Sequence, residues 1–166
     1  MEVFRGVIML PEEIKRFIGK TGNEIIMEVE KGAIRRYADA VGDFNPIYWD
    51  EEYAAKSRYG SIIAPPGFFG WPSRWSDWGP NYTSLREELA PVLAKAGYTR
   101  ALDGGIEYEF FSPVRAGDVL RALPKIVDVY ERESKTGTLL FTVTEITYTR
   151  RSGELAARAR STLIYR

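Results

Sequence analysis

One carboxylate and one phenol lie five residues apart in a stretch with the composition of a turn, and they are the first candidates for acid–base chemistry. The carboxylate is Asp43 and the phenol is Tyr48, with Asn45 and Pro46 between them. An ionised carboxylate can activate water or remove a proton. A tyrosine has an ordinary pKa of about 10, so near neutral pH it can donate a hydrogen bond but cannot act as a base. In the simpler interpretation, Asp43 binds backbone amides of the turn and Tyr48 packs in the core.

Two missing residue types limit the chemistry further. The 166 residues include no histidine and no cysteine. A Ser-His-Asp or Cys-His mechanism within this chain is therefore excluded, and so is a metal site built from imidazole or thiolate ligands. The sequence also lacks an acidic loop of the calcium-binding type, so it predicts no metal site.

Charge and hydropathy exclude other classes of protein. Lys+Arg and Asp+Glu both number 23, so the formal net charge is zero, which argues against a nucleic-acid-binding protein. No stretch approaches the roughly 20 apolar residues of a membrane span, and the N-terminus does not have the pattern of a secretory signal. We therefore expect a cytoplasmic protein that binds neither nucleic acid nor membranes.

The candidate residues must be positioned by a helix, several turns and a set of strands. Apolar residues recur at helical spacing over residues 31–41, and Gly42 ends that helix just before Asp43. Short helices are predicted at residues 11–18 and 50–56, and a longer one at 83–96. Alternating or β-branched residues predict strands at 24–30, 105–111, 119–130, 138–149 and 155–165. Within the third of these strands, Pro124 implies an edge position or a bulge.

This order favours an α+β fold in a single domain of residues 1–166, a length that suits one sizeable core. An early amphipathic helix followed by a run of strands suits a curved antiparallel sheet wrapped around a central helix. Between two of the strands, Arg115 lies in a turn with Gly117 and Asp118, where glycine can supply a positive φ. The simpler interpretation of Arg115 is therefore a residue of a hairpin turn.

Three segments carry a family resemblance: residues 37–48 (YADAVGDFNPIY), 62–66 (IIAPP) and 111–118 (FSPVRAGD). They resemble the MaoC-like dehydratases, or (R)-specific enoyl-CoA hydratases, in the N-terminal dehydratase-domain branch of that family. The resemblance implies a hot-dog fold. It also implies reversible hydration of a trans-2-enoyl thioester to a 3-hydroxyacyl thioester. Coenzyme A or an acyl carrier protein would carry the substrate, and no separate cofactor would be needed.

The resemblance assigns roles to individual residues. Asp43 matches the catalytic aspartate, but Tyr48 stands where the family has a histidine, five residues after the aspartate. Active members also bind the thioester oxygen with a glycine N–H, and the matching stretch here begins at Ala64. Two prolines in that stretch have no N–H to donate, whereas the following glycine has one. We therefore count as substrate-binding candidates Asn45, Pro65, Pro66 and Gly67.

A group of tryptophans and one arginine are further candidates. Trp71, Trp75 and Trp78 fall at the spacing of one helix face, after the proline pair. They would line a wide apolar pocket for a bulky acyl group, or else pack in the core or at a subunit interface. Arg115 would lie near the nucleotide end of coenzyme A.

The changes at Tyr48 and at the proline pair both indicate a chain that contributes more to the shape of the site than to catalysis. We therefore expect the histidine-lacking partner of a catalytic hot-dog subunit, in a heterodimer. Whether the chain is an enzyme without that partner stays open. The alternatives are an active homodimeric hydratase that uses Asp43 with Tyr48 or water, a hot-dog acyl-CoA thioesterase, and a non-catalytic module that binds acyl thioesters.

Overall fold

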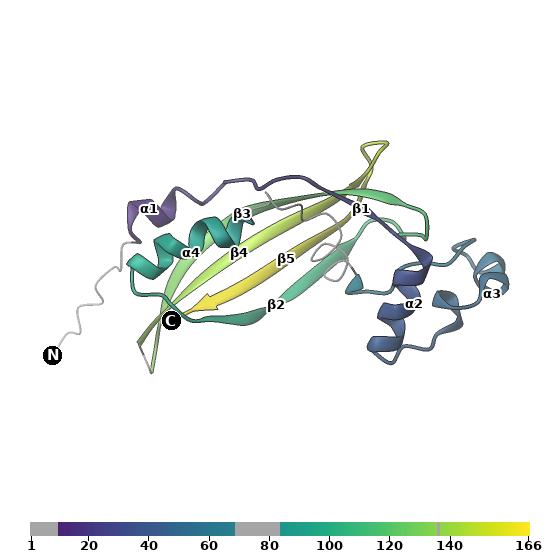
Figure 1. Cartoon of the computed structure of the whole chain (residues 1–166), viewed down its shortest axis with the longest axis horizontal. Coiled ribbons are helices and arrows are strands. Elements are labelled where there is room, and N and C mark those ends of the chain that lie inside the picture. Colours follow the sequence, from purple (N-terminus) through teal and green to yellow (C-terminus); the bar gives the residue numbers. More distant parts are fainter. Residues whose placement is uncertain (1–9, 69–83, 136) are drawn as a thin grey trace.

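A single antiparallel sheet organises the chain (Figure 1). The computed structural model describes residues 10–68 and 84–166, apart from residue 136. The strand order in the sheet is β1-β3-β4-β5-β2. The bounds are β1 (Ile25–Glu28), β2 (Ala101–Phe110), β3 (Val119–Ser134), β4 (Gly137–Arg150) and β5 (Leu155–Tyr165). All five predicted strands are confirmed, with ends shifted by several residues.

The register of β4 and β5 explains the alternation seen in the sequence. Tyr148 lies opposite Ala157 and Ile146 opposite Ala159, on the face of the sheet that packs on the core. The intervening residues Arg158 and Arg160 point to the other face. The alternating small and charged residues of β5 therefore report one buried and one solvated face.

Pro124 lies where β3 can tolerate a residue without an N–H. Strand β1 pairs with β3 only as far as Ile25 opposite Ala122. Beyond that point, Pro124 uses its carbonyl to accept a hydrogen bond from Gly22 N–H at 2.9 Å. The β3–β4 register then shifts between residues 126 and 128. Of the two predicted alternatives, the structure shows an edge position at Pro124, beyond the end of β1, and a separate bulge after residue 126.

The helices lie at two ends of the sheet, as Figure 1 shows. At one end are α1 (Glu12–Lys15) and α4 (Leu85–Lys95). At the other end are α2 (Lys31–Ala40), the 3₁₀ helix η1 (Pro46–Tyr48) and α3 (Glu51–Lys56). The helices predicted at 11–18, 31–41, 50–56 and 83–96 are thus confirmed, each somewhat shorter than expected.

Two apolar clusters form the core. The first joins α2 to β1, β3, β4 and β5, and includes Ile34, Met27, Leu120 and Tyr148. The second joins α1 and α4 to the far halves of β3, β4 and β5. Leu85, Leu89 and Leu93 are its buried α4 residues. The predicted α+β class is confirmed, and the sheet packs on two helices, α2 in the first cluster and α4 in the second, where one central helix was expected.

Two features are absent from the residues that the structure describes. None of the helices in residues 10–68 and 84–166 is long and apolar enough to cross a membrane. The same ranges contain no group of three or more His, Cys, Asp or Glu side chains placed to hold a metal ion.

Candidate functional site

Asp43 is held in a tight turn at the end of α2. Gly42, with φ of +71°, ends the helix, and the backbone N–H of Asp43 donates to Ala38 O at 2.8 Å. The Asp43 carboxylate accepts a hydrogen bond from Asn45 N at 3.1 Å. The Asn45 side chain in turn accepts from Ile47 N at 3.1 Å and caps η1. The predicted structural role of Asp43 is thus confirmed, and the turn also fixes where its half-exposed carboxylate lies.

Tyr48 is buried, with 7% of its surface exposed, and belongs to the core cluster around α2. Burial raises the pKa of its phenol, and the negative charge of Asp43 and the nearby Tyr59 raise that pKa further. Tyr48 therefore stays protonated throughout the physiological pH range. It can donate a hydrogen bond beside Asp43, but it cannot take a proton as histidine would.

A second pair of contacts fixes the turn that holds Asp43. The indole Nε1 of Trp49 donates to Asp43 O at 3.1 Å. The guanidinium of Arg35, on α2, donates to Trp49 O at 2.8 Å. Because the turn is bound to its own helix at both ends, the position of the Asp43 carboxylate is largely preorganised.

The proline pair lies in a strap that is bound to the connection between β2 and β3. Ala64 N–H donates to Val114 O at 2.8 Å, and Ala116 N–H donates to Ile62 O at 3.0 Å. At the end of the strap, Gly67 adopts φ of +87° beside Tyr37 of α2. The structure therefore brings Pro66 and Gly67 against α2, the helix that precedes Asp43.

Replacing Gly67 by alanine is expected to lower the free energy of unfolding by about 2 kcal/mol, because a side chain is strained at this φ and would also overlap the Tyr37 hydroxyl. Gly153→Ala is the matched control, since Gly153 has the same φ of +87° but nothing within 4 Å of the added carbon. Urea denaturation of both variants measures the difference. Equal losses would contradict the close packing of Tyr37 on Gly67.

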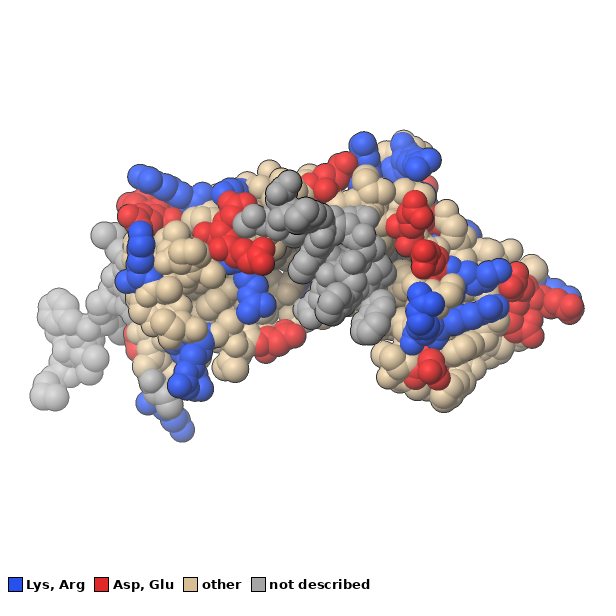
Figure 2. All heavy atoms as spheres, viewed as in Figure 1, with Lys and Arg blue, Asp and Glu red and all other residues tan. Residues whose placement is uncertain are grey.

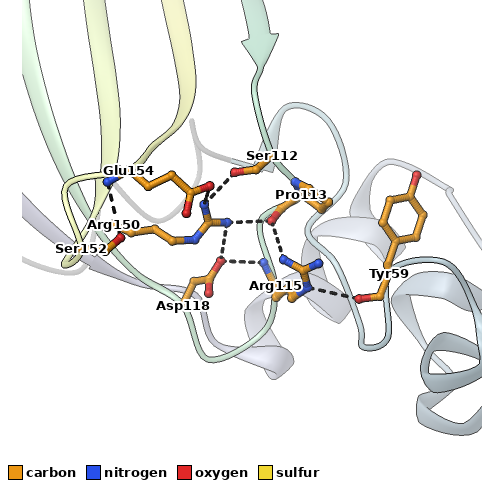
Figure 3. A network of polar contacts seen from close by, with 8 residues as sticks. All are labelled: Tyr59, Ser112, Pro113, Arg115, Asp118, Arg150, Ser152 and Glu154. Carbon is orange, nitrogen blue, oxygen red and sulfur yellow. Dashed lines mark hydrogen bonds and ion pairs between the residues drawn. The ribbon is translucent and has the colours of Figure 1, made fainter.

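Arg115 makes its contacts within the protein (Figure 3). Its Nε donates to Tyr59 O at 3.2 Å and its Nη1 donates to Pro113 O at 3.4 Å. Its backbone N–H donates to the Asp118 carboxylate at 2.9 Å, and Gly117 supplies the expected positive φ, +91°. The predicted hairpin role is confirmed, while contact with coenzyme A stays a prediction.

A polar network around Arg150 was missed by sequence reasoning. Its two terminal nitrogens donate to Ser112 Oγ at 2.7 Å, Glu154 at 2.9 Å, Pro113 O at 2.8 Å and Asp118 at 3.2 Å. Figure 3 shows the guanidinium between these acceptors, at the junction of the β4–β5 hairpin with the β2–β3 connection. Arg150 thus holds in place the segment to which the proline strap is bound.

A groove among the described residues lies away from Asp43 and Tyr48. It has a volume of about 720 Å³ and lies between the β1–α2 junction, α3 and the turn at 116–119. Its charged lining residues are Glu28, Glu30, Glu51, Asp118 and Lys31. Four carboxylates against one amine make a poor site for the phosphates of coenzyme A. On the face drawn in Figure 2, basic side chains are scattered among acidic ones.

Two predicted binding residues, Trp71 and Trp75, lie outside the described residues, as does Trp78. Their role in an acyl pocket stays a prediction. The described part of the site therefore consists of the α2–η1 turn, the proline strap and Tyr37.

Comparison with known proteins shows the family. A family model described as "FAS1-like, dehydratase domain region" matches residues 16–159. A protein of Thermomonospora curvata named "Probable enoyl-CoA hydratase alpha subunit" is 30% identical over 136 residues, which are 79% of this chain. This chain spans only 43% of that relative's length.

Two solved structures share the fold. The HadBC (3R-hydroxyacyl-ACP dehydratase) complex of Mycobacterium tuberculosis matches with a TM-score of 0.69 at 25% identity, over 89% of this chain and 96% of its own. A MaoC-like dehydratase matches with a TM-score of 0.73 at 23% identity, over 92% of this chain and 43% of its own. The chain therefore belongs to the FAS1-like dehydratase-domain family, and its fold is the hot-dog fold of the MaoC-like dehydratases.

Proposed function

We propose that this chain is a hot-dog subunit of an acyl-thioester hydratase, or dehydratase in the reverse direction, and that it shapes the site for a partner hot-dog subunit that bears a catalytic histidine. The observation that carries the proposal is Tyr48, a buried tyrosine that remains protonated beside Asp43 in a chain without histidine. The chain holds one carboxylate in place but supplies no imidazole.

The proposed hydration reaction requires acid–base groups that this chain does not fully provide. Hydration adds the oxygen of water to C3 of the enoyl group and a proton to C2, so it needs a base for the water and a donor for the thioester oxygen. Asp43 can serve as one acid–base group. Without histidine, the second proton transfer has no group of suitable pKa in the described part of this site.

A partner subunit would supply that group. The HadBC complex is a solved assembly of the same fold, and the T. curvata relative is named an alpha subunit, which supports a subunit role here. Among the described residues, strand β2 lies at the edge of the sheet and has a neighbouring strand on one side only, and such an edge favours pairing. Coenzyme A or an acyl carrier protein would present the substrate.

The test uses the purified chain alone and then mixed with each histidine-bearing MaoC-like subunit of its source organism. Loss of the enoyl absorbance of trans-2-butenoyl-CoA, and of an enoyl-CoA with a bulky acyl group, measures hydration. We expect turnover in the mixture only, with both subunits in one complex by size-exclusion chromatography. Rapid turnover by the chain alone would overturn the partner role, and turnover in none of the mixtures would overturn the function itself.

A further inference from the structure

An apolar row crosses the sheet on the face that points away from the helices. Tyr130 of β3 lies opposite Phe141 of β4, Phe141 opposite Ile164 of β5, and Ile164 opposite Leu102 of β2. Side chains alternate along a strand, and Leu140 packs in the cluster with α1 and α4, so Phe141 and its row point to the other face. Leu102 is 48% exposed. A continuous apolar row with exposed members is a feature of interaction surfaces.

Two rings and a guanidinium form one end of this row. The rings of Tyr130 and Phe141 stack with centroids 4.9 Å apart and an interplanar angle of 5°. The Cζ atom of Arg132 lies over both rings, 5.0 Å from the centroid of Tyr130 and 5.5 Å from that of Phe141. Arg132 forms no ion pair in the part of the chain that the structure describes. Its charge is therefore held beside the apolar row by cation–π contacts and remains available to an acceptor outside the chain.

An opposite charge lies on the other side of Tyr130. Asp128 is exposed and precedes Tyr130 by two residues, as Arg132 follows it by two, and within the described ranges Asp128 also has no ion pair. At about 3.4 Å per residue, the backbones of Asp128 and Arg132 each lie about 7 Å from that of Tyr130. All three residues line one hollow of about 540 Å³. Strand β3 thus carries an unpaired acid and an unpaired base, placed symmetrically about an aromatic residue.

We propose that this face of the sheet binds a second copy of the same chain, with a two-fold axis near Tyr130. In a two-fold interface the same surface is used by both copies, so residue i contacts residue j of the other copy and residue j contacts residue i. With the two β3 strands antiparallel, Asp128 of each copy meets Arg132 of the other. The two apolar rows then pack between sheets stacked about 10 Å apart. This self-complementary charge favours a second copy over a partner of one charge sign.

This interface is separate from the pairing of β2 that supports the proposed function. Edge pairing uses backbone groups in the plane of the sheet, so it leaves the side chains of this face available. The inference therefore does not rest on the proposed function. A chain that used both surfaces would form a dimer of heterodimers.

Reversal of single charges tests the inference. In Asp128→Lys a lysine meets an arginine at both contacts, and in Arg132→Glu a glutamate meets an aspartate at both. An equimolar mixture of the two variants regains two contacts of opposite charge, because the introduced lysine meets the introduced glutamate and the native arginine meets the native aspartate. Arg151→Glu is the control, since Arg151 is exposed in the turn at the other end of β4. Sedimentation equilibrium of the full chain measures association, after circular dichroism has shown that each variant is folded.

We expect the native chain and Arg151→Glu to self-associate, and each of the other two variants to associate about 100-fold more weakly. The equimolar mixture should recover most of the native affinity. If the native chain also pairs through β2, its mass will be that of a tetramer and the two variants will fall to dimers. Native association in both variants, or weak association that mixing does not restore, would overturn the inference. A native chain that stays monomeric at its highest soluble concentration would also overturn it, and would leave this face to a different partner.

Discussion

Arg150→Met is expected to lower the free energy of unfolding by about 3 kcal/mol. Arg150 and Asp118 are 16% and 21% exposed, so the substitution leaves a mostly buried carboxylate without its cation. It also removes the donor to Ser112 Oγ and leaves Pro113 O with only the longer bond from Arg115 Nη1 at 3.4 Å, and lost hydrogen bonds in a partly buried network are costly. Urea denaturation measures the loss, and the slope of the transition should be unchanged.

Arg121→Met is the matched control. Arg121 also forms one ion pair, with Glu24 at 3.4 Å, but the two side chains are 55% and 43% exposed. Exposed pairs contribute about 0–1 kcal/mol, so this variant should lose less than about 1 kcal/mol. Similar losses in both variants would mean that the Arg150 network contributes no more than a surface ion pair.

The Arg150 network also shows what the sequence could and could not reveal. The strands and α2 were predictable because their signal is local: the side-chain alternation of β5 and the helical spacing over residues 31–41 follow directly from backbone geometry. Arg150 and Asp118 are 32 residues apart, and no local period links an arginine in one strand to an aspartate in a distant turn. Nothing in the sequence separated Arg150 from its exposed neighbour Arg151.

The ends of elements depended on tertiary contacts too. Strand β2 was predicted to start at residue 105, because the alternation of apolar residues begins there. It begins at Ala101, and two adjacent glycines form a bulge in which Gly105 N–H donates to Asp103 at 2.8 Å. Gly104 lies so close to Thr162 O that a Cβ would be only 3.0 Å from it. The glycines therefore serve close packing on β5 within the strand.

The candidate site was predictable only where it depends on residues that are neighbours in the sequence. The turn at Asp43 and Asn45 follows from neighbouring residues, whose side chains bind backbone amides two positions along the chain. Tyr37 was visible only as an apolar position of a helix face. Its hydroxyl lies close to Gly67 because the fold brings residue 67 to it, and that approach depends on the strap pairing with residues 113–116.

Tyr48→His is expected to give the chain alone a gain in hydratase activity. If the proposed function is correct, the variant places an imidazole at a position close enough to Asp43 for the carboxylate charge to raise the pKa of the residue there. General acid–base catalysis contributes about 100-fold to 10,000-fold, so turnover of trans-2-butenoyl-CoA should rise about 100-fold or more above that of the native chain. The enoyl absorbance measures it, after circular dichroism has shown that the variant is folded.

Two further variants separate this gain from an incidental effect. Tyr48→Phe removes the phenol without adding a base, so it should show no gain. Combining Tyr48→His with Asp43→Asn should abolish the gain, because the carboxylate shares the acid–base work. A folded Tyr48→His variant without added activity would mean that the missing histidine is not what limits this chain. The limit would then lie in groups that a second subunit provides, because Asp43 and the imidazole would both be present in one chain.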